Sequence, residues 1–335
     1  MTKNLITRRR FSTFAIMAAS GAATLGPRAL RMARAQQTYP SRPIRFILAF
    51  GPGGVADITA RIAADKLGER LGQRLVVENQ PGPGGIAAAR SVLSAVPDGY
   101  TLGLVTNGTS ITIAIYKNPP FDPVRDFVPI STLGYFDLLF ATNAQSEFRT
   151  LADFIKTARA EPGKLNVGTI NVGGTQNLAA ELFKSSAGLD FQIIPYRGTP
   201  EVIIALLRND IQLMVDFYAA MKGALIDQKI RAVATSGRTR ASYLPQVPTA
   251  DQAGVPGYEV TSWNGIFAPV GTPPEILNTL NKAMHEILVI PEVKAKYAEL
   301  GVEAKASDPA ELKSRLQGDI RKWAAVIERA GIPKQ

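Results

Sequence analysis

The feature that most constrains the fold is a repeated order of apolar run, glycine-rich turn and amphipathic segment. Residues 44–50 are mostly apolar, residues 51–56 form a turn, and apolar side chains then recur at helical spacing to about residue 71. The order begins again at 75–78, with a second glycine-rich turn at 81–85. Apolar runs that alternate with helices favour a mostly parallel sheet covered on both faces. The sequence therefore predicts an α/β fold, in which ligands bind beyond the carboxyl ends of the strands.

The rest of the chain continues this order. Further strands are expected at 101–106, 165–169, 191–195, 211–215 and 230–234, and helices at 151–160 and 176–187 and from Thr199-Pro200 onward. Thr150 can cap the helix at 151–160. In the more helical C-terminal part, Thr272-Pro-Pro-Glu275 has the spacing of a capping box, and Asp308-Pro-Ala-Glu311 has the same spacing with an aspartate cap. The last helix is expected to bury Leu312, Leu316, Ile320, Trp323 and Ile327.

The length of 335 residues indicates about two domains. The net charge of +10 is not spread evenly along the chain. Seven basic residues and no acidic residue lie within positions 1–36, so the rest of the chain carries only about +3. No dense basic run interleaved with aromatic residues follows. The charge therefore gives no reason to expect a nucleic-acid partner.

The basic N-terminus has the organisation of an export signal. Arg8, Arg9 and Arg10 precede a weakly apolar stretch, and Ala33-Arg34-Ala35 offers a cleavage site. We expect residues 1–35 to be a signal cleaved near Ala35, which would place the protein in the periplasm. Thr7-Arg8-Arg9-Arg10-Phe11 is similar to a twin-arginine signal, with Sec export as the alternative. A retained anchor fits less well, because the apolar stretch is short and contains glycine and serine.

The scarcity of reactive side chains argues against catalysis. The chain has no cysteine, which excludes disulfides, thiolate chemistry and cysteine-bound metal. Its one histidine, His285, lies in a helical segment beside Lys282 and Glu286, where a solvated position is expected. Neither a phosphate-binding loop nor a nucleophile elbow is present. No catalytic residue, metal or cofactor is predicted.

The turn Gly51-Pro-Gly-Gly-Val-Ala-Asp57 is the first candidate binding loop. Its glycines allow close approach of a ligand, and the following helix start offers unpaired N–H groups, which suit an anion. A turn made for packing alone is the alternative. Gly51, Gly53 and Ala56 also match a dinucleotide-binding pattern, with Glu78 near the position of a ribose-binding acid. An exported dinucleotide-dependent oxidoreductase is therefore a rival reading, although no catalytic set follows.

Two further strand ends carry candidate residues. Thr169, Asn171 and Thr175 supply neutral hydrogen-bonding groups before a helix, with a plain N-cap as the alternative reading. Asp216 follows another strand and could either meet a ligand or tie its loop to a helix N-terminus. Asn107 and Arg197 are weaker candidates, and Arg197 could pair with a carboxylate.

Many segments of the chain resemble, in order, those of the substrate-binding proteins of tripartite tricarboxylate transporters, the Bug or TctC-like family. The resemblance covers about residues 38–333. The segments include Tyr39-Pro-Ser-Arg-Pro-Ile44, Phe50-Gly-Pro-Gly-Gly-Val-Ala-Asp57, Val76-Val-Glu-Asn-Gln-Pro-Gly-Pro-Gly-Gly85, Pro97-Asp-Gly-Tyr-Thr101, Phe121-Asp-Pro-Val-Arg-Asp-Phe127, Pro195-Tyr-Arg-Gly198, Gln212-Leu-Met-Val-Asp216 and Ala268-Pro-Val-Gly-Thr-Pro273.

The resemblance implies a two-domain periplasmic-binding-protein type II fold with a hinge. Domain 1 would comprise residues 38–139 and 262–335, and domain 2 residues 140–261. The implied function is to capture a small organic carboxylate by domain closure and to deliver it, as a monomer, to the membrane permease. Sensing for a signalling partner is the alternative. The implied ligand contacts are Gly53, Gly54, Ala56, Asp57, Thr169, Asn171, Thr175 and Asp216.

The chain departs from the family pattern at three positions. The family often has histidine at Asn177 and asparagine at Phe217, and lysine is commoner at Arg197. Phe217 and Tyr218 make the wall of domain 2 more aromatic. We therefore add Phe217 to the expected contacts and expect an aromatic or bulky carboxylate.

Overall fold

The computed structural model describes residues 39–170 and 172–335. The predicted export signal and Asn171 lie outside the described residues. Within the described part of the chain, no helix combines the length and apolar character needed to cross a bilayer.

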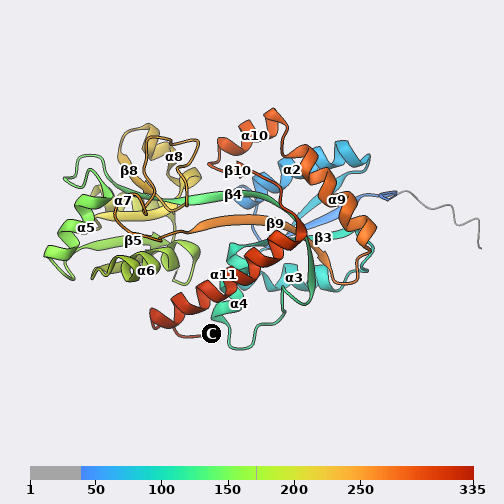
Figure 1. Cartoon of the computed structure of the whole chain (residues 1–335), viewed down its shortest axis with the longest axis horizontal. Helices are drawn as coiled ribbons and strands as arrows, with labels where there is room; N and C mark the ends of the chain where they lie inside the picture. Colours follow the sequence, from blue (N-terminus) through green and yellow to red (C-terminus); the bar gives the residue numbers. More distant parts are fainter. Residues whose placement is uncertain (1–38, 171) are drawn as a thin grey trace, which may run out of the picture. The chain divides into compact units, whose positions relative to one another are not determined.

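One ten-stranded sheet organises the molecule (Figure 1). Its main order is β2-β1-β3-β9-β4-β7-β5-β6. The predicted α/β fold is confirmed, because parallel strands occupy both ends of this order. At one end, β1 pairs with β2 and β3, and at the other, β5 pairs with β6 and β7. These strands are β1 (Ile44–Leu48), β2 (Leu75–Asn79), β3 (Thr101–Thr106), β5 (Asn166–Ile170), β6 (Gln192–Tyr196) and β7 (Leu213–Phe217).

Two long antiparallel strands, which the sequence analysis did not predict, connect these ends. β4 (Phe127–Asn143) pairs with β9 (Thr261–Pro269) along its first half. From Leu138 onward β4 pairs instead with β7 and with β8 (Ile230–Thr235). We call the part built on β1–β3 lobe 1 and the part built on β5–β8 lobe 2. A short strand of lobe 1, β10 (Glu303–Ala304), adds to β4.

Helices cover both lobes. Lobe 1 carries α2 (Val55–Leu71), α3 (Ile86–Leu93), α4 (Asn107–Ile115), α9 (Pro274–Ile287), α10 (Pro291–Ala298) and α11 (Pro309–Arg329), with a 3-10 turn at Pro83–Gly85. Lobe 2 carries α5 (Leu151–Ala160), α6 (Thr175–Ala187), α7 (Thr199–Leu207) and α8 (Tyr218–Ile226). The predicted cap of α5 is confirmed, because the Thr150 side chain accepts from the Asp153 amide.

The capping-box prediction for Thr272-Pro-Pro-Glu275 is wrong. The N-cap of α9 is Pro273, and the Thr272 hydroxyl donates backwards to the Pro269 carbonyl. Asp308 does occupy the N-cap position of α11, but its side chain makes no capping hydrogen bond. The prolines at these helix starts fix the chain direction without a side-chain cap.

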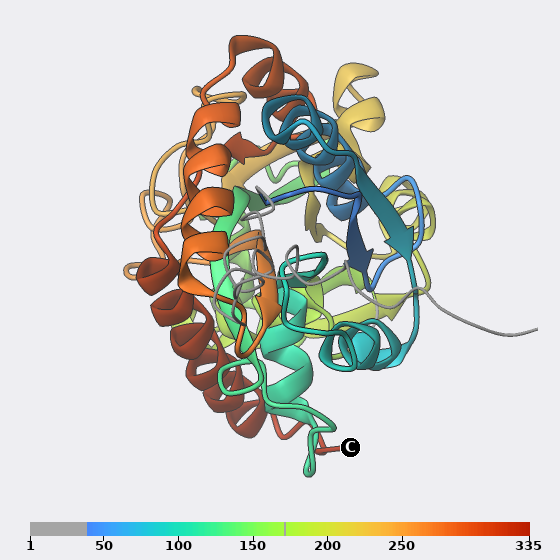
Figure 2. The same cartoon turned by 90° about the vertical axis from the view of Figure 1, so that its right-hand side faces the viewer.

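Helix α11 packs into the cores of both lobes. Leu312 and Leu316 belong to the lobe 1 cluster, whereas Trp323 and Ile327 are buried in the main cluster of lobe 2. These four predicted core residues are confirmed, and Ile320 is only partly buried. α11 lies beside α4, which also contributes to the lobe 2 cluster (Figures 1 and 2). The two helices therefore join the lobes in addition to the strands β4 and β9.

Asp137 of β4 makes the stability of this fold depend on pH. Burial raises the pKa of its carboxyl to about 6, although Thr261 donates a hydrogen bond to it at 2.9 Å. Because the pKa of this carboxyl is higher in the folded state than in the unfolded state, the protein loses stability as the pH rises from about 4 to about 6. Asp137→Asn should therefore stabilise the protein at pH 8, by ~3 kcal/mol at most, and have little effect at pH 4. Urea unfolding at both pH values measures this difference, and a gain that is equal at both would contradict the assignment.

Candidate functional site

The loops that precede α2 and α6 have the same backbone geometry, one in each lobe. Gly53 has a φ of 91° and Gly173 has a φ of 73°, a conformation that favours glycine. The next residues, Gly54 and Gly174, are the helix N-caps, with ψ values of 169° and 168°. Neither cap has a side chain that could cover the helix end.

A side chain four residues further on fastens each loop in the same way. The Gly53 amide donates to Oδ2 of Asp57 at 2.9 Å, and the Gly173 amide donates to Oδ1 of Asn177 at 2.9 Å. The first intrahelical hydrogen bonds run from Ile58 to Gly54 and, equivalently, from Leu178 to Gly174. The N–H groups of the first helical turns therefore have no acceptor within their helices. Each lobe thus presents a helix N-terminus that can bind an anion.

Asp57 is held by its own protein surroundings. Its carboxylate is buried and also accepts from Arg61 Nε at 3.0 Å and from Asn79 Nδ2 at 2.8 Å. Burial alone would raise the pKa of Asp57, but the hydrogen bonds from Arg61, Asn79 and Gly53 outweigh it and keep the pKa low. The carboxylate is therefore charged at neutral pH and fixes the loop. Asn79, which the sequence analysis missed, reaches this site because β2 ends there.

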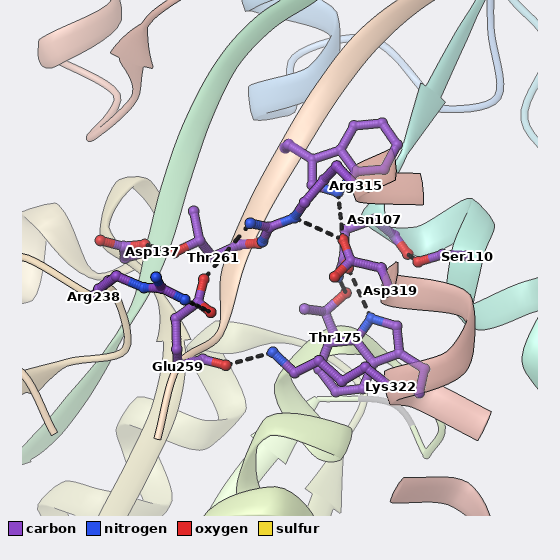
Figure 3. Close-up of polar contacts among 12 residues, drawn as sticks. Asn107, Ser110, Asp137, Thr175, Arg238, Glu259, Thr261, Arg315, Asp319 and Lys322 are labelled. Atoms are coloured by element: carbon purple, nitrogen blue, oxygen red, sulfur yellow. Dashed lines mark hydrogen bonds and ion pairs between the residues drawn. The ribbon is translucent and has the colours of Figure 1, made fainter. Parts of the chain in front are cut away.

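Asn107 links the two lobes at the first turn of α4. Its Nδ2 donates to Oγ1 of Thr175 at 3.3 Å (Figure 3). Its Oδ1 accepts from Trp323 Nε1 at 2.8 Å. Asn107 is 1% exposed, so both contacts are shielded from water. The start of α4 therefore lies beside the start of α6. Sequence reasoning ranked Asn107 low, because its partners are far away along the chain.

Asp216 ties three segments of lobe 2 together. Its carboxylate accepts from Gln176 Nε2, from the Thr199 hydroxyl and from the Phe217 amide. Burial raises its pKa, which these hydrogen bonds partly oppose. In the described structure its oxygens are thus used to tie the starts of α6 and α7. This arrangement matches the second role considered for Asp216, which was to tie its loop to a helix N-terminus.

The remaining predicted residues lie around these helix starts. Thr169 is fully buried, and its hydroxyl accepts from Asn177. Gly53 and Gly54 are exposed, Ala56 is half-buried, and Arg197 is exposed with its amide bonded to Glu201. The Phe217 ring packs edge-on against Phe136 of β4, with centroids 5.1 Å apart. Among the described residues, no hydrogen bond joins the loop before α2 directly to the loop before α6.

His285 does not belong to this arrangement. It is 48% exposed on its helix and lies 3.7 Å from Asp308. In the described part of the chain, no group of histidine, aspartate and glutamate side chains could hold a metal ion. The helix starts offer hydrogen bonds and partial charge, which are means of binding rather than of reaction.

Comparison with known proteins identifies the family. The model of the tripartite tricarboxylate transporter family receptor, TctC, matches residues 59–332. The chain belongs to this receptor family. BugT from Bordetella pertussis is 30% identical over 296 residues, which cover 88% of this chain and 91% of BugT. The predicted Bug or TctC-like membership is confirmed, and the family is one of receptors rather than enzymes.

Solved structures extend the likeness to the whole fold. The receptor is 32% identical to Rpa4515 of R. palustris with adipate, with a TM-score of 0.74 over 88% of this chain and 99% of that one. It is 30% identical to MatC of Rhodopseudomonas palustris with bound malate, with a TM-score of 0.71 over 86% of this chain and 100% of that one. The two-domain type II binding-protein fold is thereby confirmed.

Proposed function

We propose that this receptor captures a small organic carboxylate between its lobes and delivers it to a tripartite tricarboxylate-type permease. The observation that carries the proposal is the matched pair of glycine-capped helix starts, one in each lobe. Two such N-termini can bind negative charge without reacting with it. Adipate and malate in the two similar structures support a carboxylate as the ligand class.

Closure of the lobes would complete the site. We propose that lobe 1 binds first through Gly53, Gly54, Ala56 and the amide of Asp57, and that lobe 2 then adds Thr175 and its neighbours. We propose that the two bodies that move are domain 1, residues 38–139 with 262–335, and domain 2, residues 140–261. Closure requires that the ligand gain contacts in the closed state. The strands β4 and β9 pass between the lobes and would bend.

The proposed location is the periplasm, after export by the N-terminal signal. A solved periplasmic transporter protein supports this location, because it is 31% identical to the receptor and covers 89% of this chain. Delivery to the permease requires the receptor to be released on that side of the membrane. We propose that it acts as a monomer.

The ligand is proposed to carry a ring or a bulky group. Phe217 stands at the start of α8 and already packs against Phe136, so a ligand ring there would extend an aromatic cluster. A thermal-shift screen of aliphatic di- and tricarboxylates and of aromatic carboxylates tests both carboxylate binding and the preference for an aromatic ligand. We expect aromatic acids to raise the melting temperature most. Shifts by small aliphatic acids only would refute the aromatic preference, and no shift by any carboxylate would refute the proposed function.

A further inference from the structure

A cavity lies beside the crossing strands, outside the helix starts described above. Its volume is about 890 Å³, within the range of small-molecule sites. Its walls come from both lobes: residues 238–243 lie between β8 and β9, whereas residues 303–322 include β10 and most of α11. Tyr135 and Asp137 of β4 line it as well, and they share one face of that strand.

Several charges in this cavity are already paired. Arg315 lies between Glu259 and Asp319, at 3.6 Å and 3.0 Å, and Arg238 lies 3.5 Å from Glu259 (Figure 3). Lys322 donates to the backbone carbonyl of Glu259. These contacts hold α11 against the start of β9.

Asp137, which is half-buried, differs from the paired acids of the cavity. Thr261 donates to its Oδ1, and no ion pair of Asp137 is found among the described residues. Tyr243 also lines the cavity, and its buried hydroxyl has no hydrogen-bond partner within residues 39–170 and 172–335. A largely desolvated carboxylate without a cation and a buried hydroxyl without a partner are both costly, and an ammonium group would satisfy both.

The charges that face Asp137 favour a cation further. Burial raises its pKa most and the hydrogen bond from Thr261 opposes this; among the charged groups, Glu259 and Glu303 raise the pKa and Arg315 lowers it. The aromatic lining also suits an ammonium group, because Lys305 Nζ already lies 5.8 Å from the centre of the Tyr135 ring. A compact metal ion fits less well, since no three ligating side chains come together in the described residues.

We propose that this cavity is a second binding site, for an alkylammonium compound whose cationic group meets Asp137 and Tyr243. The site is separate from the carboxylate site, and its existence does not depend on the proposed transport function. A ligand in it would touch both lobes at the crossing strands.

Calorimetric titration of the full mature chain with putrescine and with 1-butylamine at pH 8 tests the proposal, with 1-butanol as the uncharged probe. We expect saturable binding of at least one amine with a dissociation constant of about 1 mM or tighter, and no binding of 1-butanol. Asp137→Asn should weaken binding at least ~10-fold. The matched variant Glu311→Gln, which removes an exposed acid of the same cavity, should change it less than ~3-fold.

The pH dependence gives a second readout. Binding should weaken by ~10-fold between pH 8 and pH 5, because Asp137 is protonated at the lower pH. The proposal is overturned if neither amine binds saturably, if 1-butanol binds equally well, or if Asp137→Asn and Glu311→Gln have equal effects. Asp137→Asn removes a half-buried charge and is expected to fold, so a loss of binding in it can be interpreted.

Discussion

Val55→Pro is expected to weaken carboxylate binding by about 10- to 100-fold without unfolding the protein. Val55 is the first residue of α2, and its N–H is one of the donors that the helix leaves free. Proline removes this N–H, and loss of a hydrogen bond to a charged ligand costs ~1.5–3 kcal/mol. Proline is tolerated at this position, and the preceding Gly54 has the extended conformation that proline requires of its neighbour.

The matched control is Val55→Ala, which shortens the side chain but keeps the amide. Its affinity for the same carboxylate should stay within ~3-fold of the wild type, because a half-buried valine contributes little else here. Calorimetry measures the affinities, and melting curves should differ by no more than about 3 °C. Equal affinity of the proline and alanine variants would exclude the α2 amides from the site.

Trp323→Ala is expected to lower the free energy of unfolding by ~3–5 kcal/mol. Trp323 is 1% exposed and belongs to the lobe 2 cluster, although it comes from the C-terminal helix. Its indole N–H is also the partner of Asn107, which in turn contacts Thr175. The change would remove core packing and leave the buried Asn107 oxygen without its donor.

Trp323→Phe separates these two causes. It keeps most of the ring but removes the N–H, so we expect a loss of ~1–3 kcal/mol from the unpaired Asn107 oxygen. Urea unfolding followed by circular dichroism measures both variants. A loss below about 1 kcal/mol in Trp323→Ala would show that α11 does not join the two lobes.

Local signals in the sequence predicted the individual elements well. α5 begins and ends where the Thr150 cap and the helical spacing placed it, and β3 has the expected bounds. These features depend on residues only a few positions apart, such as the reciprocal hydrogen bonds of Thr150 and Asp153. The two glycine loops were also found, because an αL glycine before a helix is encoded in a short segment.

Long-range features could not be predicted in this way. β4 is a 17-residue strand that contains Pro129, Gly134 and Asp137, residues that do not predict one continuous strand. Bulges lie next to Pro129 and Gly134, whereas Asp137 pairs regularly with Thr261. The Asn107 to Thr175 contact spans 68 positions, and the Asn79 to Asp57 contact spans 22. Sequence reasoning named Asp57 and Asp216 but could not show that protein donors surround both.

The most direct test of the account is a crystal structure of the receptor with the carboxylate that gives the largest thermal shift. We predict that one carboxylate group lies within hydrogen-bonding distance of the first-turn amides of α2, with Thr175 or its neighbours on the other side. A carboxylate bound instead to Arg238 and Arg315 behind the crossing strands, with the two helix starts unengaged, would contradict it.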